Sequence, residues 1–326
     1  RCDKNYWEII LHAEYRRLSS QQITCLMKML VTELWRLGIV QAPVQTIAAA
    51  GSLAPFSVRW IEADRSLCFL ADPFGIWRDN KLYLFAEAYD YRSRRGAIVA
   101  YVLDASLNII EYRTVLSEPW HLSYPYVFEA DGEIWMLPEG YKSGTLSLYR
   151  AVNFPWQWEK VPEFSFPCAA IDATPVFAQG SWWMFYTPPR ARTNTLMLAQ
   201  AERLTGQWKN ISSHPIREDI SSARMGGTPF YQDGKLIIPV QDCSKTYGGA
   251  IRLLSLSPDT LHQPEFTPGA YLQASHKDAP FSDGLHTLSA AGDFTLIDTK
   301  RILYGSPHRI CVDLGRAWKK RQSRHA

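Results

Sequence analysis

The sequence has 326 residues, 46% of them hydrophobic and 13% aromatic, a composition typical of folded globular proteins rather than disordered chains. Its formal net charge is only +3, and four cations lie in a short tail after Trp318. A nucleic-acid groove needs cations spread along one face to neutralise phosphates, so this distribution argues against nucleic-acid binding.

The cysteines and the apolar runs bear on the cellular compartment. The six cysteines are scattered without a close pair, which predicts neither a disulfide framework nor a zinc site and favours a reducing, cytoplasmic compartment. No apolar run approaches the ~20 residues of a transmembrane segment, and the first residues lack the layout of a signal peptide. The sequence opens on Arg1 rather than Met, so upstream sequence can be missing.

Residues 1–56 are predicted to form a short helical N-terminal segment and a linker. The run Ser-Ser-Gln-Gln at 19–22 reads as a capping box and predicts a helix over residues 20–37, ended by Gly38. The apolar residues of this helix share one face: Ile23, Leu26, Met27, Leu30, Val31 and Leu34. That face is expected to pack on the rest of the chain or on an upstream domain, with an amphipathic membrane anchor as the alternative. Residues 40–56 look like a linker.

From residue 72 onward one pattern recurs five times. It consists of a polar residue, then in most repeats a proline, an apolar strand, a turn with Gly or Asn, and a second strand. The second position of the repeat is held by Pro73, Pro125, Pro175, Pro229 and Thr287. A period near 50 residues is typical of propeller blades, because one small sheet cannot bury both faces without neighbours. We therefore predict an all-β, five-bladed β-propeller over residues 57–315 and a basic tail over 316–326. The strand near residues 57–61 should complete the last blade, near 281–315.

The repeats also bring polar residues to equivalent positions. Alignment on the turns groups Asp72, Tyr124, Thr174, Thr228 and His286 at the entrance of the inner strands. A second set follows each turn and comprises Glu87, Glu139, Thr187, Gln241 and Asp298. The loops before the inner strands contribute His121, Asp172, Arg224 and Asp283. Because inner strands surround the axis, these residues are predicted to converge at one mouth of the central channel.

Carboxylates and a histidine that meet at one place provide the proton donor, the base and the hydroxyl-binding groups that acid–base chemistry on a sugar requires. The candidate catalytic residues are Asp72, Glu139 and Asp172. The candidate substrate-binding residues are His121, Tyr124, Arg224, Gln241, Asp283, His286 and Asp298. The alternative is that the Asp-Pro and Thr-Pro pairs only cap turns and that the histidines are structural.

Motifs for other chemistries are absent from the sequence. There is no Gly-rich phosphate loop and no Gly-x-Ser-x-Gly elbow, which argues against nucleotide hydrolysis and serine esterase chemistry. No cofactor is expected. A central Ca²⁺ held by axis-facing oxygens stays open as an alternative, because separate blades can assemble such a site without a local motif.

Several long strings carry a family resemblance, among them HLSYPYVFEADGEIWMLPEG, SLYRAVNFPWQWE and GKLIIPVQDCSKTYGGAI. They resemble the N-terminal domain of plant glucosamine inositolphosphorylceramide transferases and its bacterial relatives, over residues 69–304. The resemblance implies a sugar or glycoconjugate as partner. In the plant family that the chain resembles, glycosyl transfer is attributed to a separate C-terminal domain, which we expect this chain to lack. In bacteria the domain often follows a formyltransferase-like domain, of which residues 1–55 would be a remnant or connector.

More distantly, the repeats resemble the arabinanase and xylosidase clan of five-bladed propeller glycosidases. Members of that clan use an Asp base in the first blade, a tuning Asp in the second and a Glu acid in the third. Asp72 matches the first place. Tyr124 stands at the second and Thr187 at the third, while Glu139 lies one blade early. These departures argue against simple glycosidase activity.

The leading hypothesis from the sequence is a carbohydrate-active propeller that binds or acts on a sugar or glycoconjugate at the channel mouth, by glycosyl transfer or hydrolysis with paired carboxylates. The main alternative is a non-catalytic glycan-recognition or scaffold module that serves a partner transferase. A metal-stabilised structural domain is the third. Whether the chain is an enzyme stays open at this point.

Overall fold

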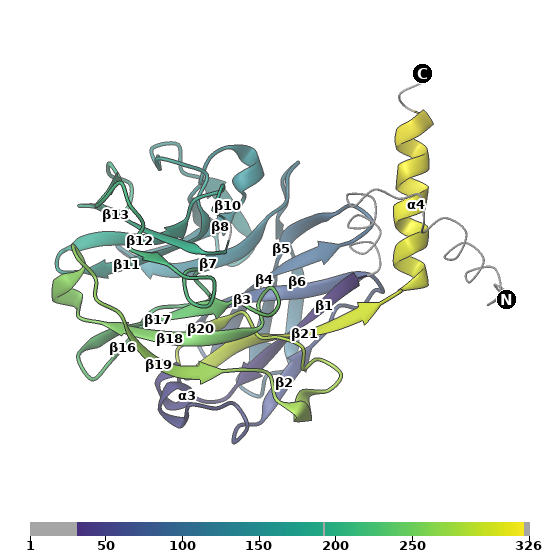
Figure 1. The fold of residues 1–326 in the computed structure, drawn as a ribbon, viewed down its shortest axis with the longest axis horizontal. Coiled ribbons are helices and arrows are strands. Elements are labelled where there is room, and N and C mark those ends of the chain that lie inside the picture. The colour runs from purple at the N-terminus through teal and green to yellow at the C-terminus, as the bar shows by residue number, and fades with distance from the viewer. Residues whose placement is uncertain (1–30, 192, 323–326) are drawn as a thin grey trace. The chain divides into compact units, whose positions relative to one another are not determined.

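The computed structural model describes residues 31–191 and 193–322 (Figure 1). Residues 34–301 form one compact unit, and the described residues 31–33 and 302–322 belong to a second, smaller unit. Five antiparallel sheets form a five-bladed β-propeller, which confirms the predicted fold class.

The first four blades each add their strands in chain order. Blade one contains β3 (Cys68–Arg78), β4 (Lys81–Asp90), β5 (Arg95–Asp104) and β6 (Ile109–Leu116). Blade two contains β7 (Ser123–Ala130), β8 (Glu133–Glu139), β9 (Tyr149–Asn153) and β10 (Gln157–Lys160). Blade three contains β11 (Ile171–Ala178), β12 (Ser181–Thr187), β13 (Thr195–Ala201), β14 (Lys209–Asn210) and β15 (Arg217–Glu218). Blade four contains β16 (Phe230–Gln232), β17 (Lys235–Asp242), β18 (Ala250–Leu256) and β19 (Thr267–Leu272). Short 3₁₀ helices in the connections are η1 (Tyr141–Ser143), η2 (Pro258–Thr260) and η3 (His276–Asp278).

The fifth blade closes the ring with strands from both ends of the propeller. Its strands are β1 (Val31–Val40), β2 (Val58–Ile61), β20 (Leu288–Ala291) and β21 (Phe294–Tyr304). They are ordered β2–β1–β21–β20. The predicted association of residues 57–61 with the last blade therefore occurs, with β1 lying between β2 and β21.

A tight turn connects the innermost strand of each blade to its neighbour, which in blade five is the pair β20 and β21. In four blades two consecutive turn residues have positive φ, the geometry of a type I′ turn: Asp79-Asn80, Asp131-Gly132, Gln179-Gly180 and Asp233-Gly234. The twist of this turn matches that of the flanking strands, so each turn fixes the register of its hairpin. The turns predicted from the repeats are therefore confirmed.

The helix predicted over residues 20–37 is wrong for its C-terminal part. Residues 31–37 belong to β1, and residues 20–30 lie outside the described part of the chain. Strands on both sides of β1 satisfy its backbone, so tertiary pairing overrides the helical period of the apolar residues. Gly38, the predicted helix stop, lies within β1, where a Cβ would come 2.7 Å from the Trp60 side chain.

The predicted domain boundaries change for the same reason. The propeller begins with β1 rather than at residue 57, and it ends with β21. The predicted linker at 40–56 contains α3 (Val44–Ala50), whose Val44 and Ile47 are buried in a hydrophobic cluster. A second helix, α4 (Pro307–Gln322), replaces the end of the predicted propeller and most of the predicted tail.

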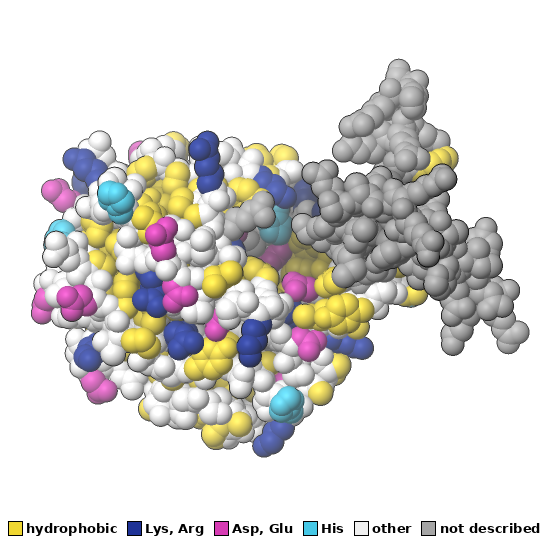
Figure 2. Space-filling view, viewed as in Figure 1, with side chains coloured by type: hydrophobic (Ala, Val, Ile, Leu, Met, Phe, Trp, Pro, Cys, Tyr) yellow, Lys and Arg dark blue, Asp and Glu magenta, His cyan; other side chains and the backbone are white. Residues whose placement is uncertain are grey.

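Apolar side chains fill the space between neighbouring blades and hold the inner strands in place. The largest cluster extends from blade one to blade four and includes Phe85, Trp183 and Phe185. Aromatic contacts join adjacent sheets, as where Phe85 meets Trp158 edge-on at 5.5 Å. On the face shown in Figure 2, acidic and basic side chains of the propeller alternate rather than gather by sign. Within the described residues, no helix is long and apolar enough to span a membrane.

Candidate functional site

Bulges near the start of the inner strand place polar residues at the axis in three blades. The register shifts lie between Ala71 and Phe74, Ser123 and Tyr126, and Ile171 and Thr174. Inside these bulges Asp72, Tyr124 and Asp172 have φ values of 52°, 44° and 48°. Such backbone angles cost of order 1–3 kcal/mol in a non-glycine residue, and residues that adopt them cluster at functional sites. The bulges are therefore the first structural sign of a site.

The bulges also correct the predicted alignment of the third repeat. Asp172, and not Thr174, occupies the position equivalent to Asp72 and Tyr124. Counted back from the turn, Asp172 lies eight residues before Gly180, as Asp72 and Tyr124 lie before their turns, whereas Thr174 lies only six before it. Thr174 was grouped with them because it immediately precedes the repeat proline, which in this blade lies two residues further from the bulge. Thr174 instead bonds to a neighbouring blade, with its Oγ1 2.9 Å from the Tyr124 hydroxyl.

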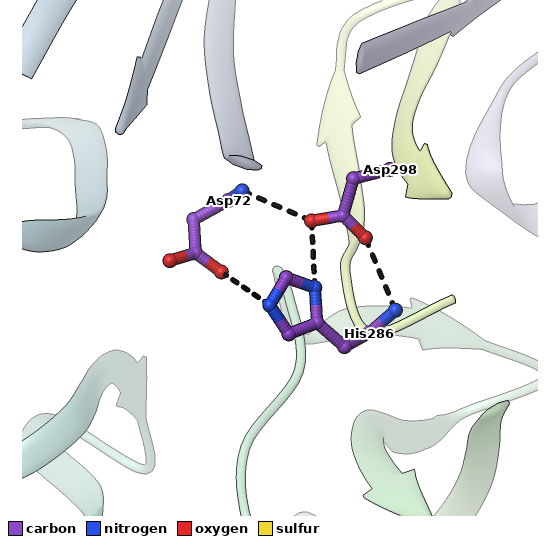
Figure 3. Close-up of side chains that lie close together, drawn as sticks. All are labelled: Asp72, His286 and Asp298. Atoms are coloured by element: carbon purple, nitrogen blue, oxygen red, sulfur yellow. Dashed lines mark hydrogen bonds and ion pairs between the residues drawn. The ribbon is translucent and has the colours of Figure 1, made fainter. Parts of the chain in front are cut away.

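Asp72, His286 and Asp298 form one tightly connected group, the axial triad (Figure 3). His286 Nδ1 lies 2.7 Å from Asp298 Oδ2, and His286 Nε2 lies 3.5 Å from Asp72 Oδ1. The backbone N–H of Asp72 donates to Asp298 Oδ2 at 2.9 Å, and those of His286 and Thr287 donate to Asp298 Oδ1 at 3.0 Å. Asp72 accepts the Tyr124 N–H at 3.1 Å and the Thr287 hydroxyl at 3.3 Å. The triad thereby joins blade five to blade one and blade one to blade two.

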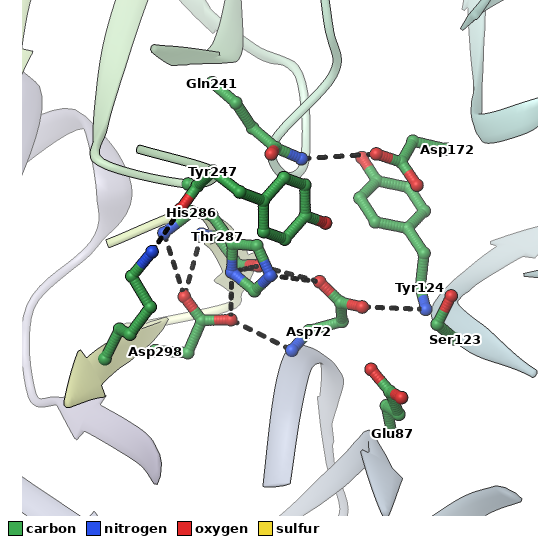
Figure 4. A network of polar contacts seen from close by, with 12 residues as sticks. Asp72, Glu87, Ser123, Tyr124, Asp172, Gln241, Tyr247, His286, Thr287 and Asp298 are labelled. Atoms are coloured by element: carbon green, nitrogen blue, oxygen red, sulfur yellow. Dashed lines mark hydrogen bonds and ion pairs between the residues drawn. The ribbon is translucent and has the colours of Figure 1, made fainter. Parts of the chain in front are cut away.

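Asp172 lies across the axis from the triad (Figure 4) and forms a buried ion pair with Arg224. Arg224 Nε donates to Asp172 Oδ2 at 2.6 Å, and the two side chains are 10% and 3% exposed. Gln241 Nε2 donates to the same oxygen at 3.2 Å and to the Met225 carbonyl at 2.8 Å. This pair links blade three to blade four.

Two further carboxyl groups at the axis have fewer partners. Glu139 accepts one hydrogen bond, from the Ser123 hydroxyl at 3.2 Å. Glu87 points toward Asp72 and Ser123 in Figure 4, and His121 Nε2 lies 3.6 Å from its Oε1, beyond normal hydrogen-bond length. Both residues are buried, with exposures of 6% and 5%.

Burial and crowding raise the pKa values of these carboxyl groups. Burial is the main cause for Glu139, and the nearby charge of Asp172 adds to it, so that the pKa of Glu139 is raised to about 7. Burial also raises the pKa of Asp72 to about 6, although the charge of His286 opposes the shift. The pKa of Glu87 is raised well above its ordinary value by burial and by the charge of Asp72. The cluster therefore retains protons at pH values where isolated carboxyl groups are ionised.

The pKa values of the two histidines shift in opposite directions. Burial lowers the pKa of His121 to about 4, helped by the charge of Lys142, so this ring is neutral. Its Nδ1 accepts the Gly96 N–H at 2.8 Å, which leaves the proton on Nε2. Burial also opposes the charged form of His286, but the charges of Asp298 and Asp72 outweigh burial and raise its pKa.

Aromatic rings surround His286. Trp35 stacks on it with 3.8 Å between ring centroids, and Tyr247 meets it edge-on at 5.5 Å. Arg224 donates to the Tyr247 hydroxyl at 3.4 Å. The buried Lys300 donates to the Thr246 hydroxyl at 3.0 Å and to the Tyr247 carbonyl, which fixes the loop that carries Tyr247.

The axial triad is also the place to test for a metal ion, because one potential ligand atom from each residue lies within 4.8 Å of the others. The residues fit such an ion poorly. Every carboxylate oxygen of Asp72 and Asp298 already accepts a hydrogen bond, and both His286 nitrogens face those oxygens. Ca²⁺ takes six to eight oxygen ligands, which this triad does not offer.

Most predicted site residues do meet at the axis. The exception is Asp283, whose side chain is exposed and whose backbone N–H donates to the Lys300 carbonyl at 2.8 Å. His121 lies at the rim, where it contacts Glu87.

Four residues of the site were not selected from the sequence. Glu87 follows its turn at the same offset as Glu139, so the repeat alignment contained the signal for it. Trp35 was assigned to a helix, and Tyr247 and Lys300 fall outside the repeated positions. Nothing local in the sequence distinguishes these three from ordinary residues.

The sequence matches the family model described as glucosamine inositolphosphorylceramide transferase 1, N-terminal, over residues 54–275. The chain belongs to this family. It is 34% identical over 262 residues to glucosamine inositolphosphorylceramide transferase 1 of Arabidopsis thaliana, covering 75% of this chain and 34% of that protein. It is 37% identical over 209 residues to the protein of that name from Oryza sativa subsp. indica, covering 61% and 28%. The chain thus spans about a third of the length of these relatives.

Solved structures of glycoside hydrolases share the propeller fold. The catalytic domain of a GH62 α-L-arabinofuranosidase from Coprinopsis cinerea superposes with a TM-score of 0.55 at 10% identity, over 73% of this chain and 92% of that one. A family 117 glycoside hydrolase from Zobellia galactanivorans gives a TM-score of 0.52 at 11% identity, over 75% and 88%. At these identities the likeness shows the fold alone. Family and fold together agree with the resemblances predicted from the sequence.

Proposed function

We propose that this domain is a carbohydrate-active enzyme module that cleaves or transfers a glycosyl group at the axis, with Glu139 as proton donor and Asp72 as base. The observation that carries the proposal is the buried, sparsely partnered carboxyl group of Glu139, whose pKa is raised to about 7. A glycosidic oxygen needs a proton as the bond breaks, and a carboxyl group that is still protonated near neutral pH can supply it.

Asp72 has the environment of a base. Its carboxylate accepts the Tyr124 N–H and the Thr287 hydroxyl and faces His286, so three groups support the negative charge. The backbone bulge fixes its direction toward the axis. A water molecule or an acceptor hydroxyl that loses a proton to Asp72 would attack the anomeric carbon while Glu139 protonates the leaving oxygen.

Asp172 is proposed to tune this acid rather than to take the proton itself. Its charge is the largest cause after burial of the raised pKa of Glu139. The Arg224 guanidinium and the Gln241 amide hold Asp172 in place. Arg224 and Tyr247 are then the groups proposed to orient sugar hydroxyls beside the acid.

The relatives support a glycoconjugate as substrate. They are named for glucosamine and for inositolphosphorylceramide, and the two solved structures described above that share the fold are glycoside hydrolases. We therefore propose a sugar attached to a phosphoinositol-type headgroup as the first substrate class to test.

The test separates turnover from binding. Glu139→Gln keeps the shape of the side chain and removes the titrating group, so it should lower turnover ~10²–10⁴-fold while binding survives. Product release and ligand affinity are measured on a panel of aryl glycosides and glucosamine-bearing inositol phosphate lipids. Glu163→Gln, a change at an exposed glutamate, is the matched control. Full turnover by Glu139→Gln would disprove the assignment of the acid.

A second candidate is a glycan-recognition module that serves a partner transferase. The observation in its favour is that the chain matches only about a third of each named transferase. Under this alternative the wild-type protein binds the glycoconjugate without product release, and Glu139→Gln weakens binding by only ~1–2 kcal/mol. The same two assays therefore distinguish the candidates.

A further inference from the structure

The carboxylates of the axial triad are saturated with hydrogen-bond donors. Asp298 accepts three backbone N–H groups, which belong to Asp72, His286 and Thr287. Asp72 accepts the Tyr124 N–H and the Thr287 hydroxyl. These bonds connect blades five, one and two at the point where the ring closes. Two buried negative charges at this junction require a compensating positive charge.

His286 has the position of that positive charge (Figure 3). Its two ring nitrogens face two different carboxylates, at 2.7 Å from Asp298 Oδ2 and at 3.5 Å from Asp72 Oδ1. A neutral ring with its proton on Nδ1 would turn the Nε2 lone pair toward the Asp72 oxygen, which is repulsive. A ring protonated on both nitrogens carries a positive charge that attracts both carboxylates, and its Nδ1–H donates to Asp298 at 2.7 Å.

The aromatic contacts also suit a charged ring. Trp35 stacks on the imidazole at an interplanar angle of 16°, so the negative face of the indole lies against it. Tyr247 closes another side of the ring edge-on.

We propose that His286 is held as a resident imidazolium, which takes the place of a metal ion at the axis and positions Asp72. The positioning of Asp72 rests on the proposed function, whereas the charged state of His286 does not. A divalent ion at the axis would have to displace His286 from both carboxylates and break backbone bonds that close the ring.

The groups that face His286 come from four elements of the structure. Asp72 lies on β3, Asp298 on β21, Trp35 on β1, and Tyr247 on the loop between β17 and β18. Lys300 opposes a positive charge on His286, because its own ammonium group lies nearby. Its Nζ is 5.2 Å from the centroid of the Trp35 ring, which stacks on His286. Asp172, across the axis, favours it. The two carboxylates in direct contact outweigh the single lysine behind the indole, which accords with the raised pKa of His286.

The protonation state can be measured without a substrate. In ¹⁵N NMR spectra at pH 7, both ring nitrogens of His286 should carry protons, with the signals assigned by their loss in His286→Gln. His214→Gln, a change at an exposed histidine, is the control. Millimolar Ca²⁺ or Mg²⁺ should leave the His286 signals and the Tm of the wild type unchanged. A neutral His286 ring at pH 6, or signals that a divalent ion shifts, would overturn the proposal.

The positioning role has its own measurement, which is also independent of turnover. Removal of the imidazolium charge in His286→Gln should raise the pKa of the Asp72 carboxyl by ~1 unit or more. A ¹³C NMR titration of that carboxyl group measures the change. Asp72→Asn identifies the signal. An unchanged Asp72 titration in a folded His286→Gln protein would overturn the positioning role. If no glycoconjugate is turned over, the proposed reaction fails while these two measurements still decide the state and role of His286.

Discussion

Two groups of carboxyl groups in the central cluster differ in how fully they are partnered. In the well-partnered group, Asp298 and Asp172 are held by backbone N–H groups, by His286 and by Arg224. In the sparsely partnered group, Glu139 has one hydroxyl donor and Glu87 has a neutral histidine beyond hydrogen-bond length. Well-partnered carboxylates hold the blades together, whereas a sparsely partnered carboxyl group keeps a proton that it can donate. The contrast separates Asp298 and Asp172 from the proposed acid, Glu139.

The largest effect is expected at the buried ion pair. Arg224→Met leaves the Asp172 carboxylate buried without its cationic partner and with the Gln241 amide as its side-chain donor, and loss of one partner of such a pair costs ~3–5 kcal/mol. Denaturant unfolding of the variant and the wild type measures this loss of stability. Arg224→Lys, which keeps the charge, should recover part of it. A loss below ~1 kcal/mol for Arg224→Met would mean that its ion pair with Asp172 does not stabilise the fold.

The next effect is expected at the axial triad. Asp298→Asn places an amide NH₂ against backbone N–H donors and removes the charge beside His286, so we expect a loss of ~2–3 kcal/mol in unfolding free energy. Thermal unfolding at constant pH provides the measurement. Equal stability of Asp298→Asn and Glu139→Gln would remove the distinction between well-partnered and sparsely partnered carboxyl groups.

The pH dependence of the unfolding free energy tests the sparsely partnered carboxyl group of Glu139. The pKa of Glu139 is about 7 in the folded protein and ~4.3 when unfolded, so folding takes up a proton between these values. Glu139 therefore destabilises the folded state as pH rises through this range, by up to ~1.4 kcal/mol per pH unit. Glu139→Gln should remove that slope and become relatively more stable toward pH 7. Asp72, with a pKa of about 6, acts in the same direction, and His121, with a pKa of about 4, acts in the opposite one.

The smallest effect is expected outside the cluster. Asp283 was predicted to belong to the site, but its side chain is exposed, so Asp283→Asn should leave glycoconjugate binding unchanged. Binding and unfolding assays under the conditions used for the other variants provide the comparison. A large loss of binding would place Asp283 back in the site.

The fold was largely predictable from the sequence, because each blade repeats a local signal. Turn residues such as Gly132 and Gly234 mark the hairpins, and a period near 50 residues gives the blade count. The closing strand β1 was not predictable, since one of its two partners, β21, lies more than 250 residues away and its apolar spacing suits a helix equally well. Long-range pairing decides such a segment, and one sequence does not contain that information.

The site was predictable to the extent that it follows the repeat. Asp72, Glu139 and Asp298 stand at repeated offsets and do meet at the axis. Asp172 lies eight residues before Gly180, the same offset at which Asp72 precedes Asn80, so the turn spacing did contain its position. The repeat proline lies two residues further along in this blade and pointed to Thr174 instead. Trp35 and Lys300 act through packing around His286, and their positions follow only from the closed ring.

The central claim, that Glu139 is a buried acid which still holds its proton near neutral pH, is tested most directly by pH-difference infrared spectroscopy. The carbonyl band of a protonated carboxyl group should disappear with a midpoint near pH 7 in the wild type and be missing from Glu139→Gln. Glu163→Gln should retain the band. A band assigned to Glu139 that disappears near pH 4.5, as for an exposed glutamate, would contradict the account.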